Sequence, residues 1–233
     1  MKKFLLTAAS VLGAIHGVAD AAADTLWRLS RDCETALALS AGPTYLRDGA
    51  GVYVLGDKEF ELIRESENGY VCLVQRNADE ALIPQCFDRM GQWAHVPVHK
   101  DVVKKRLAGM EWSQIFAEQA QGFVDGTYKR APGPGVVYMA SDFNFTMDFA
   151  SGNKRKIWPH VMYHAPDVTH ADIGSDPQEA VKNPGMPIIA GQGPLGYMIS
   201  FVDHPTDSAD VEARCAGQLP DPDDYLRFPP GLN

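Results

Sequence analysis

The amino terminus most constrains how this chain can fold, because it has the layout of an export signal. Lys2 and Lys3 give a positive start, residues 4–18 follow without a charge, and small residues form an A-x-A site within residues 19–23. The uncharged run is shorter than the roughly 20 apolar residues that a membrane-spanning helix needs. We therefore predict a signal peptide over residues 1–21, with residue 23 as the alternative cleavage point. The mature chain would be periplasmic or secreted.

Export determines how the four cysteines are interpreted, because thiols oxidise outside the cytoplasm. Cys72 and Cys86 form the best predicted pair, since the short segment between them makes a loop that closes easily. A bridge around a loop of about 15 residues contributes on the order of 3 kcal/mol. Pairing of Cys33 with Cys215 is left open. The alternative is a nucleophilic Cys72, which a disulfide would exclude.

Composition and charge limit the partners of the mature chain. Roughly 210 of the 233 residues remain after cleavage, enough for one well-packed domain. The formal charge of −9 becomes −10, because the signal carries two lysines and one aspartate. Such a chain repels phosphate backbones and anionic lipids, so we expect no nucleic-acid partner. We also expect no membrane span after signal cleavage, and the oligomeric state is left open.

Hydrophobic periodicity predicts a single α+β domain over residues 24–218, followed by a proline-rich extended tail over 219–233. Its expected parts are an N-terminal helix (24–39), an antiparallel β meander (44–47, 51–55, 59–64 and 70–75), a central helical pair (98–107 and 111–121) and C-terminal strands (135–141, 156–165 and 196–202). Residues 143–149 alternate as in a further strand or a loop. Residues 77–96 are interpreted as irregular and 166–187 as a long loop.

Histidines and acids gather in the last third of the chain and supply the candidate site. We single out His160, His164, His204, Asp172 and Asp203, because imidazole and carboxylate groups serve both metal sites and general acid–base sites. On one straight strand His160 and His164 would lie about 13 Å apart, too far to share a metal. His204 is the expected partner of His160 if their strands are neighbours. The alternative is that these histidines only cap strand ends.

Aromatic residues near these histidines are predicted to line a pocket: Phe143, Phe145, Trp158 and Tyr163. The leading hypothesis is a protein that binds a small molecule or a metal ion near His160 and His204. No cofactor motif is evident, and a divalent metal such as zinc or copper would suit these ligands. The alternatives are a hydrolase with a His/Asp general base and a structural or partner-binding envelope protein.

Several short motifs resemble a family of exported bacterial hypothetical proteins of unassigned function. They include Gly-Tyr-Val-Cys-Leu-Val at residues 69–74 and Trp-Pro-His-Val-Met-Tyr at residues 158–163. The resemblance implies a signal peptide, a single domain and paired Cys72 and Cys86, but no reaction. Relatives often carry an extra histidine shortly before the Trp-Pro-His unit. Here that neighbourhood is Lys154-Arg155-Lys156-Ile157, which weakens a metal site built on clustered histidines.

Overall fold

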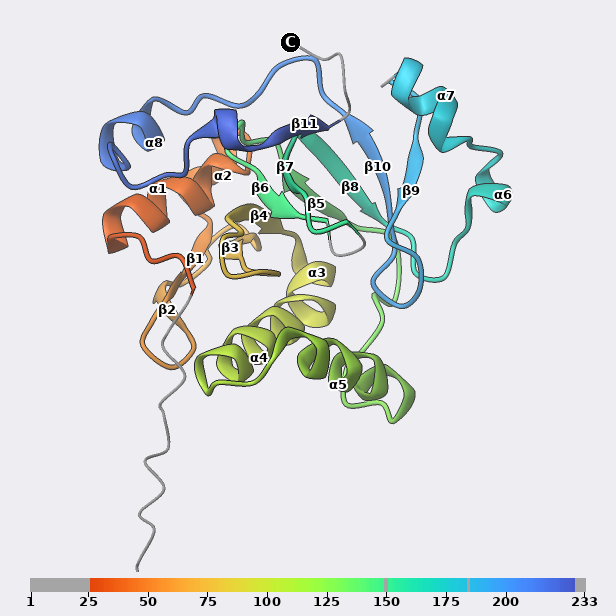
Figure 1. Ribbon diagram of the computed structural model, residues 1–233, viewed down its shortest axis with the longest axis horizontal. Coiled ribbons are helices and arrows are strands. Elements are labelled where there is room, and N and C mark those ends of the chain that lie inside the picture. The colour runs from red at the N-terminus through yellow and green to blue at the C-terminus, as the bar shows by residue number, and fades with distance from the viewer. Residues whose placement is uncertain (1–25, 149–150, 184, 229–233) are drawn as a thin grey trace, which may run out of the picture.

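The computed structural model describes residues 26–148, 151–183 and 185–228 (Figure 1). The predicted signal peptide, the first two residues of the predicted N-terminal helix, Phe149 and the last five residues of the predicted tail lie outside these ranges. The described chain is a single α+β domain built around one large sheet, as the sequence predicts.

The large sheet runs in the order β2-β1-β3-β4-β5-β8-β10-β9. Its strands are β1 (Gly51–Leu55), β2 (Phe60–Arg64), β3 (Val71–Gln75), β4 (Ile83–Phe87), β5 (Val136–Met139), β8 (His160–His164), β9 (Ile188–Ala190) and β10 (Tyr197–Phe201). A small sheet joins β6 (Phe145–Met147), β7 (Lys154–Ile157) and β11 (Leu226–Phe228) in the order β11-β7-β6.

Helices cover both faces of the large sheet, as Figure 1 shows for α1 above it and α3 to α5 below it. The helices are α1 (Arg31–Ser40), α2 (Thr44–Arg47), α3 (Arg89–Ala94), α4 (Val96–Leu107), α5 (Trp112–Val124), α6 (His170–Ile173), α7 (Pro177–Lys182), α8 (Ala209–Arg214) and the short 3₁₀ helix η1 (Pro222–Asp224). None of them, within the described ranges, has the length and apolar character that a bilayer crossing requires.

Alternation along β3 explains why two of the hydrophobic cores lie on opposite faces of the sheet. Cys72 and Val74 belong to the core under α1, whereas Leu73 belongs to the core that includes Val96 and Val103 of α4. Successive side chains of a strand point to opposite faces, so a strand covered on both faces buries both sets. Residues 71–74 are accordingly all buried.

The structure confirms the predicted central helical pair and most predicted strands, but two predictions about the start of the sheet are wrong. Residues Thr44–Arg47 form a short helix with Pro43 at its N-cap. The sequence pattern missed this helix because four residues are too few for hydrophobic periodicity to distinguish a helix from a strand. The β meander is not purely antiparallel, since β3 pairs with β1 in parallel. The chain leaves β2 beside the start of β1, where the Gly51 amide donates to the Tyr70 carbonyl at 2.8 Å.

Three further segments differ from the sequence-based expectation. The region 77–96 contains β4 and α3, and β4 shows no alternation because all five of its residues are buried. The expected strand 156–165 is broken at Pro159 into β7 and β8, which belong to different sheets. The expected loop 166–187 contains α6 and α7, and β11 of the predicted tail pairs with β7.

Two disulfides connect distant parts of the fold. Cys72 and Cys86 are direct neighbours across the β3–β4 ladder and form the predicted bridge. Cys33 of α1 also bonds to Cys215, just after α8, with a sequence separation of 182 residues. This second bridge fastens the carboxy-terminal part of the chain onto α1. It encloses most of the described fold in one covalent loop, which restricts the unfolded chain strongly.

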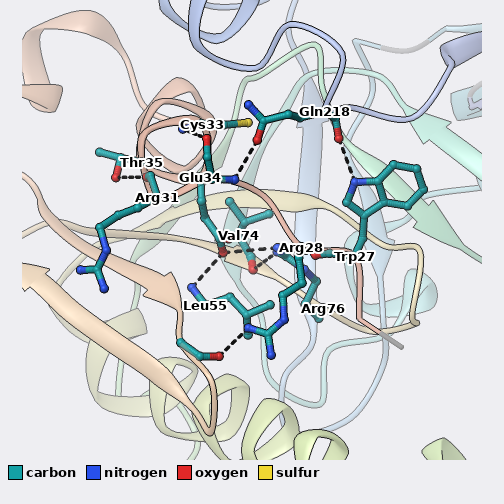
Figure 2. Close-up of polar contacts among 12 residues, drawn as sticks. Trp27, Arg28, Arg31, Cys33, Glu34, Thr35, Leu55, Val74, Arg76 and Gln218 are labelled. Atoms are coloured by element: carbon teal, nitrogen blue, oxygen red, sulfur yellow. Dashed lines mark hydrogen bonds and ion pairs between the residues drawn. The ribbon is translucent and has the colours of Figure 1, made fainter. Parts of the chain in front are cut away.

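A buried ion pair joins α1 to the sheet (Figure 2). The Arg76 guanidinium lies 3.3 Å from the Glu34 carboxylate, and both side chains are at most 2% exposed. Arg76 also donates to the Val74 carbonyl at 2.6 Å, and the Leu55 amide donates to Glu34 at 3.1 Å. Burial raises the pKa of Glu34 and lowers that of Arg76, so each charge depends on the other.

Replacing Glu34→Gln should lower the free energy of unfolding by about 3–5 kcal/mol, because it leaves the Arg76 charge buried without a counterion. The matched control is Glu61→Gln, which breaks the exposed Arg31–Glu61 pair and should cost less than about 1 kcal/mol. Urea denaturation of both variants measures the difference. Similar losses in the two variants would show that Glu34 does not neutralise a buried charge.

Candidate ligand-binding cavity

Asp88 organises a group of aromatic side chains where β4 passes into α3. Its carboxylate caps α3 by accepting from the Gly91 amide at 2.8 Å, and it also accepts from the Val136 amide of β5 at 2.8 Å. The same carboxylate lies 3.2 Å from Nε2 of His164 on β8. Three elements are therefore held together by one acidic side chain.

His164 is completely packed behind this carboxylate. Its side chain is 1% exposed, and a side chain in place of Gly135 would clash with its ring. Nε2 faces the Asp88 carboxylate, and Nδ1 is buried with no hydrogen-bond partner in the protein. His164 thus packs behind the neighbouring aromatic rings and helps to position them.

His95 links this group to a cavity. Its ring, at the α3–α4 junction, stacks on His164 and on Tyr197 of β10, each with ring centroids 4.9 Å apart. The Tyr197 hydroxyl lies 2.6 Å from His95 Nδ1. One helical turn along α4, His99 packs against Phe87 with ring centroids 5.5 Å apart. Strand β10, from the far part of the chain, thereby meets the start of α4.

The environment keeps these side chains uncharged. Burial lowers the pKa of His95 to about 2, with smaller contributions from His99 and His164. Burial also lowers the pKa of His99 to about 4. For Tyr197, burial and then the nearby Asp88 charge raise the pKa well above its usual value. At neutral pH all three side chains are therefore neutral hydrogen-bonding groups.

A cavity of about 220 Å³ adjoins these residues, between the sheet and helices α4 and α5. Amide and aromatic side chains dominate its walls, and Arg76 is the one lining residue with a full charge. The lining residues are Gln75, Arg76, Asn77, Gln85, His95, His99, Val102, Phe116, Gln119, Ala190, Gly191, Leu195 and Tyr197. The turn between β9 and β10 closes one side.

Three wall residues carry buried polar atoms with no hydrogen-bond partner in the protein: Arg76 Nε, Gln85 Oε1 and His99 Nε2. Gln85 is oriented by its own amide nitrogen, which donates to the Gln75 side-chain oxygen. An unpartnered buried polar atom costs about 1–3 kcal/mol, and native proteins contain few of them. These atoms are themselves buried, so they lie behind the surface of the cavity.

The cavity walls contain no serine, threonine, cysteine, lysine, aspartate or glutamate, so they offer no carboxylate that could orient a histidine base. A general base works best with a pKa near the working pH. The pKa values of about 2 and 4 for His95 and His99 lie far below it.

The structure places the sequence-predicted His160 in the protein interior. It is 3% exposed, its Nδ1 donates to the Trp158 carbonyl at 2.8 Å, and burial lowers its pKa to about 4. The expected strand neighbours are present, because His160 is opposite Phe201 in the β8–β10 ladder. His204 follows β10 by three residues and is exposed. No hydrogen bond joins the two histidines among the bonds of the described residues.

The other predicted ligands lie apart from one another. His164 belongs to the Asp88 cluster, and Asp172 accepts from the Thr169 amide at 2.8 Å in the capping box of α6. Asp203 is exposed. In the described ranges, no group of three or more His, Cys, Asp or Glu side chains is arranged to hold a metal ion. The zinc or copper site therefore stays a prediction.

The four predicted pocket-lining aromatics do not surround one space. Phe145 is 1% exposed and meets Tyr225 edge-on, and Phe143 packs against the core under α1. Trp158 donates to the Val202 carbonyl at 2.8 Å beside β7 and β11. Tyr163 is 41% exposed on β8.

Sequence reasoning missed the cavity residues His95, His99, Gln85 and Tyr197. One signal was available, because His95 and His99 are four residues apart and thus share a helix face. That signal was hidden by the interpretation of residues 77–96 as irregular. Tyr197 and His95 are 102 residues apart in the sequence, and no sequence pattern indicated that they would be in contact.

Comparison with known proteins adds no relative: no family model matches the chain, and neither a curated protein nor a solved structure is significantly similar to it. The resemblance to exported hypothetical proteins stays a prediction.

Stability should fall as the pH is lowered from 6.5 to about 5. The unfolded chain takes up protons on His95, His99 and His160 near pH 6.5, whereas their folded pKa values are about 2, 4 and 4. The unfolded state then binds more protons, and each histidine costs up to about 1.4 kcal/mol per pH unit.

The check is urea denaturation across this pH range in the wild-type protein and in His160→Asn, whose amide can still donate to the Trp158 carbonyl. The variant should show a slope that is smaller by about one proton. A wild-type stability that stays constant, or increases, between pH 6.5 and 5 contradicts the neutral buried state of these histidines.

Proposed function

We propose that this protein is an exported, periplasmic or secreted, binding protein. It would hold a small polar molecule in the cavity between the sheet and helices α4 and α5. The observation that carries the proposal is a cavity of about 220 Å³ whose walls combine neutral amide, imidazole and phenol side chains with apolar ones. Small-molecule sites typically combine apolar walls with a few polar groups that fix orientation. Val102, Phe116 and Leu195 are the apolar part.

Binding is favoured over the hydrolase alternative because the cavity walls lack a serine, threonine or cysteine nucleophile and a base of suitable pKa. A metal-binding function near His160 has less support, since His160 already donates to a backbone carbonyl and His204 is exposed. The ligand site that we propose is therefore at His95 and His99, and not at His160 and His204.

Export is supported by the amino-terminal sequence and by the two disulfides, which oxidising compartments allow to form. Fusing residues 1–30 to a phosphatase that is active only outside the cytoplasm should give active reporter. Mass spectrometry of the mature protein should find a new amino terminus after residue 21 or 23. The control replaces Lys2 and Lys3 by glutamate, which should reduce export several-fold. An inactive reporter with the native segment contradicts export.

Ligand binding can be tested with a cavity-filling variant. Gln119 lines the cavity from α5 and is partly exposed, so Gln119→Trp should fill the space with little cost to the fold. Gln114→Trp places the same side chain at an exposed position of α5 outside the cavity and is the matched control.

A fragment library is screened against the mature protein by amide NMR. We expect fragments that shift the amide signals of cavity residues, with shifts that disappear in Gln119→Trp and persist in Gln114→Trp. If no fragment shifts these signals, or if the shifts survive in Gln119→Trp, the cavity is not a binding site.

A further inference from the structure

A larger cleft, of about 370 Å³, opens between α1, α2 and α8, on the side of the sheet away from α4 (Figure 1). Its volume lies within the roughly 300–1,000 Å³ that is typical of small-molecule sites. Four aspartates and three arginines line it, so its walls present charges of both signs. This composition sets the cleft apart from the neutral cavity beside α4.

The two half-buried arginines of the cleft are held by backbone carbonyls and not by its aspartates. Arg47 Nε donates to the Gly42 carbonyl at 3.0 Å, and Arg64 donates to the carbonyls of Ala50 and Arg47. Among the described residues Arg47 Nη1 has no hydrogen-bond partner, and unlike the buried Nη2 it is open to solvent. The Arg47 guanidinium is therefore fixed in orientation while one of its donors stays available.

The carboxylates of the same cleft are also short of cationic partners. Asp32 and Asp48 make no ion pair or hydrogen bond within the described ranges, and Asp207 accepts from a backbone amide two residues along at 3.0 Å. Asp210 lies 3.9 Å from Arg214, one helical turn along α8. All four aspartates are exposed, so a molecule in the cleft can reach their oxygen atoms.

Opposite charges therefore face this cleft without pairing across it. Burial lowers the pKa of Arg47, and the charges of Asp207 and Asp210 offset this effect only in part. These two carboxylates are near enough to act on Arg47, yet no ion pair joins them to it in the described part of the chain. The space between them can hold a molecule that carries a charge at each end.

A covalent bond fixes the spacing of the two walls. Asp32 precedes Cys33 and Arg214 precedes Cys215, and these cysteines form the disulfide between α1 and the end of α8. The Thr206 hydroxyl also donates to the last carbonyl of α1, just before the cleft aspartates. The charged side chains of α1 and α8 are therefore presented from backbones that are tied together.

Ligands of a single charge suit these walls less well. An anion would approach four carboxylates, and a cation would approach three guanidinium groups. The acids are not arranged as a metal site, because no group of three or more His, Cys, Asp or Glu side chains that could hold an ion occurs in residues 26–148, 151–183 and 185–228. A molecule with both charges gains from both sets of side chains.

We propose that this cleft binds a small zwitterion of amino-acid size, with its ammonium group at Asp207 and Asp210 and its carboxylate at Arg47. Hydrogen bonds between charged partners of these kinds are about twice as strong as neutral ones. Ala36 and Leu39 of α1 supply apolar surface for the carbon chain of the ligand. The site is separate from the cavity beside α4, so the inference does not depend on the function proposed above.

Two sets of matched probes test the inference: 4-aminobutyrate with butyrate and butylamine, and L-alanine with propionate and ethylamine. Within each set the carbon chains are similar, and each analogue lacks one of the two charges. The probes are titrated into the mature protein at pH 7 and low salt, because salt screens exposed charges. Amide NMR signals of α1 and α8 report binding.

We expect at least one of the two zwitterions to bind at least tenfold more tightly than both of its analogues. If neither zwitterion shifts these signals at millimolar concentration, or if an analogue binds as tightly as its zwitterion, the inference is wrong. Signals of α4 and α5 report the other cavity, so this result does not depend on the fragment screen.

Asp207→Asn tests the ammonium contact, because asparagine keeps an oxygen for the Ala209 amide and loses the charge. The variant should weaken the zwitterion at least fivefold without weakening its carboxylate analogue. The matched control is Asp221→Asn, since exposed Asp221 accepts from the Asp223 amide at the same 3.0 Å outside the cleft. Unchanged affinity in Asp207→Asn, or equal losses in both variants, overturns the assignment.

Arg47→Met tests the carboxylate contact in the reciprocal way. It should weaken the zwitterion at least fivefold without weakening the amine analogue, because the methionine removes only the positive charge from the cleft. An equal loss for the zwitterion and the amine would show that Arg47 acts through the fold, and would overturn its contact with the ligand. If the melting temperature shows that Arg47→Met is unfolded, the comparison of Asp207→Asn with Asp221→Asn decides the inference.

Discussion

The Glu34–Arg76 ion pair lies where α1 packs against the large sheet. Arg76 follows β3 and bonds to Val74, Trp27 and Glu34, so it connects the sheet, the amino-terminal segment and α1. It also forms part of the cavity wall on the side of α4. Because a buried charge is stable only when it is paired, the position of α1 and the neutrality of the cavity depend on the same contact. Figure 2 shows how the surrounding bonds converge on this pair, with Gln218 joining the carboxy-terminal segment to Trp27.

The two disulfides reinforce the same arrangement. The Cys33–Cys215 bridge starts at the residue next to Glu34, so it fixes α1 against the carboxy-terminal part of the chain. The Cys72–Cys86 bridge ties β3 to β4, whose opposite face presents Gln85 to the cavity. Covalent bonds and the buried ion pair thus connect the elements on one face of the sheet, and the cavity lies on its other face.

The cavity is formed by residues whose own hydrogen bonds are incomplete. Asp88 accepts from the Gly91 and Val136 amides and contacts His164, whereas Arg76, Gln85, His99 and His164 each keep one buried atom without a partner in the protein. Neutral imidazoles, amides and a paired guanidinium suit an uncharged polar molecule better than an ion.

The amino-acid sequence by itself determined the α+β class, the central helical pair, most strands and the Cys72–Cys86 bridge, because each of these leaves a local pattern or a short loop. It could not determine β4, since a strand buried on both faces shows no alternation, nor the parallel pairing of β1 with β3. It also directed attention to His160, whose burial against Trp158 is decided by the surrounding strands. Only the tertiary structure brought His95, His99, Gln85 and Tyr197 together, because contacts across 102 residues depend on strand order and not on sequence spacing.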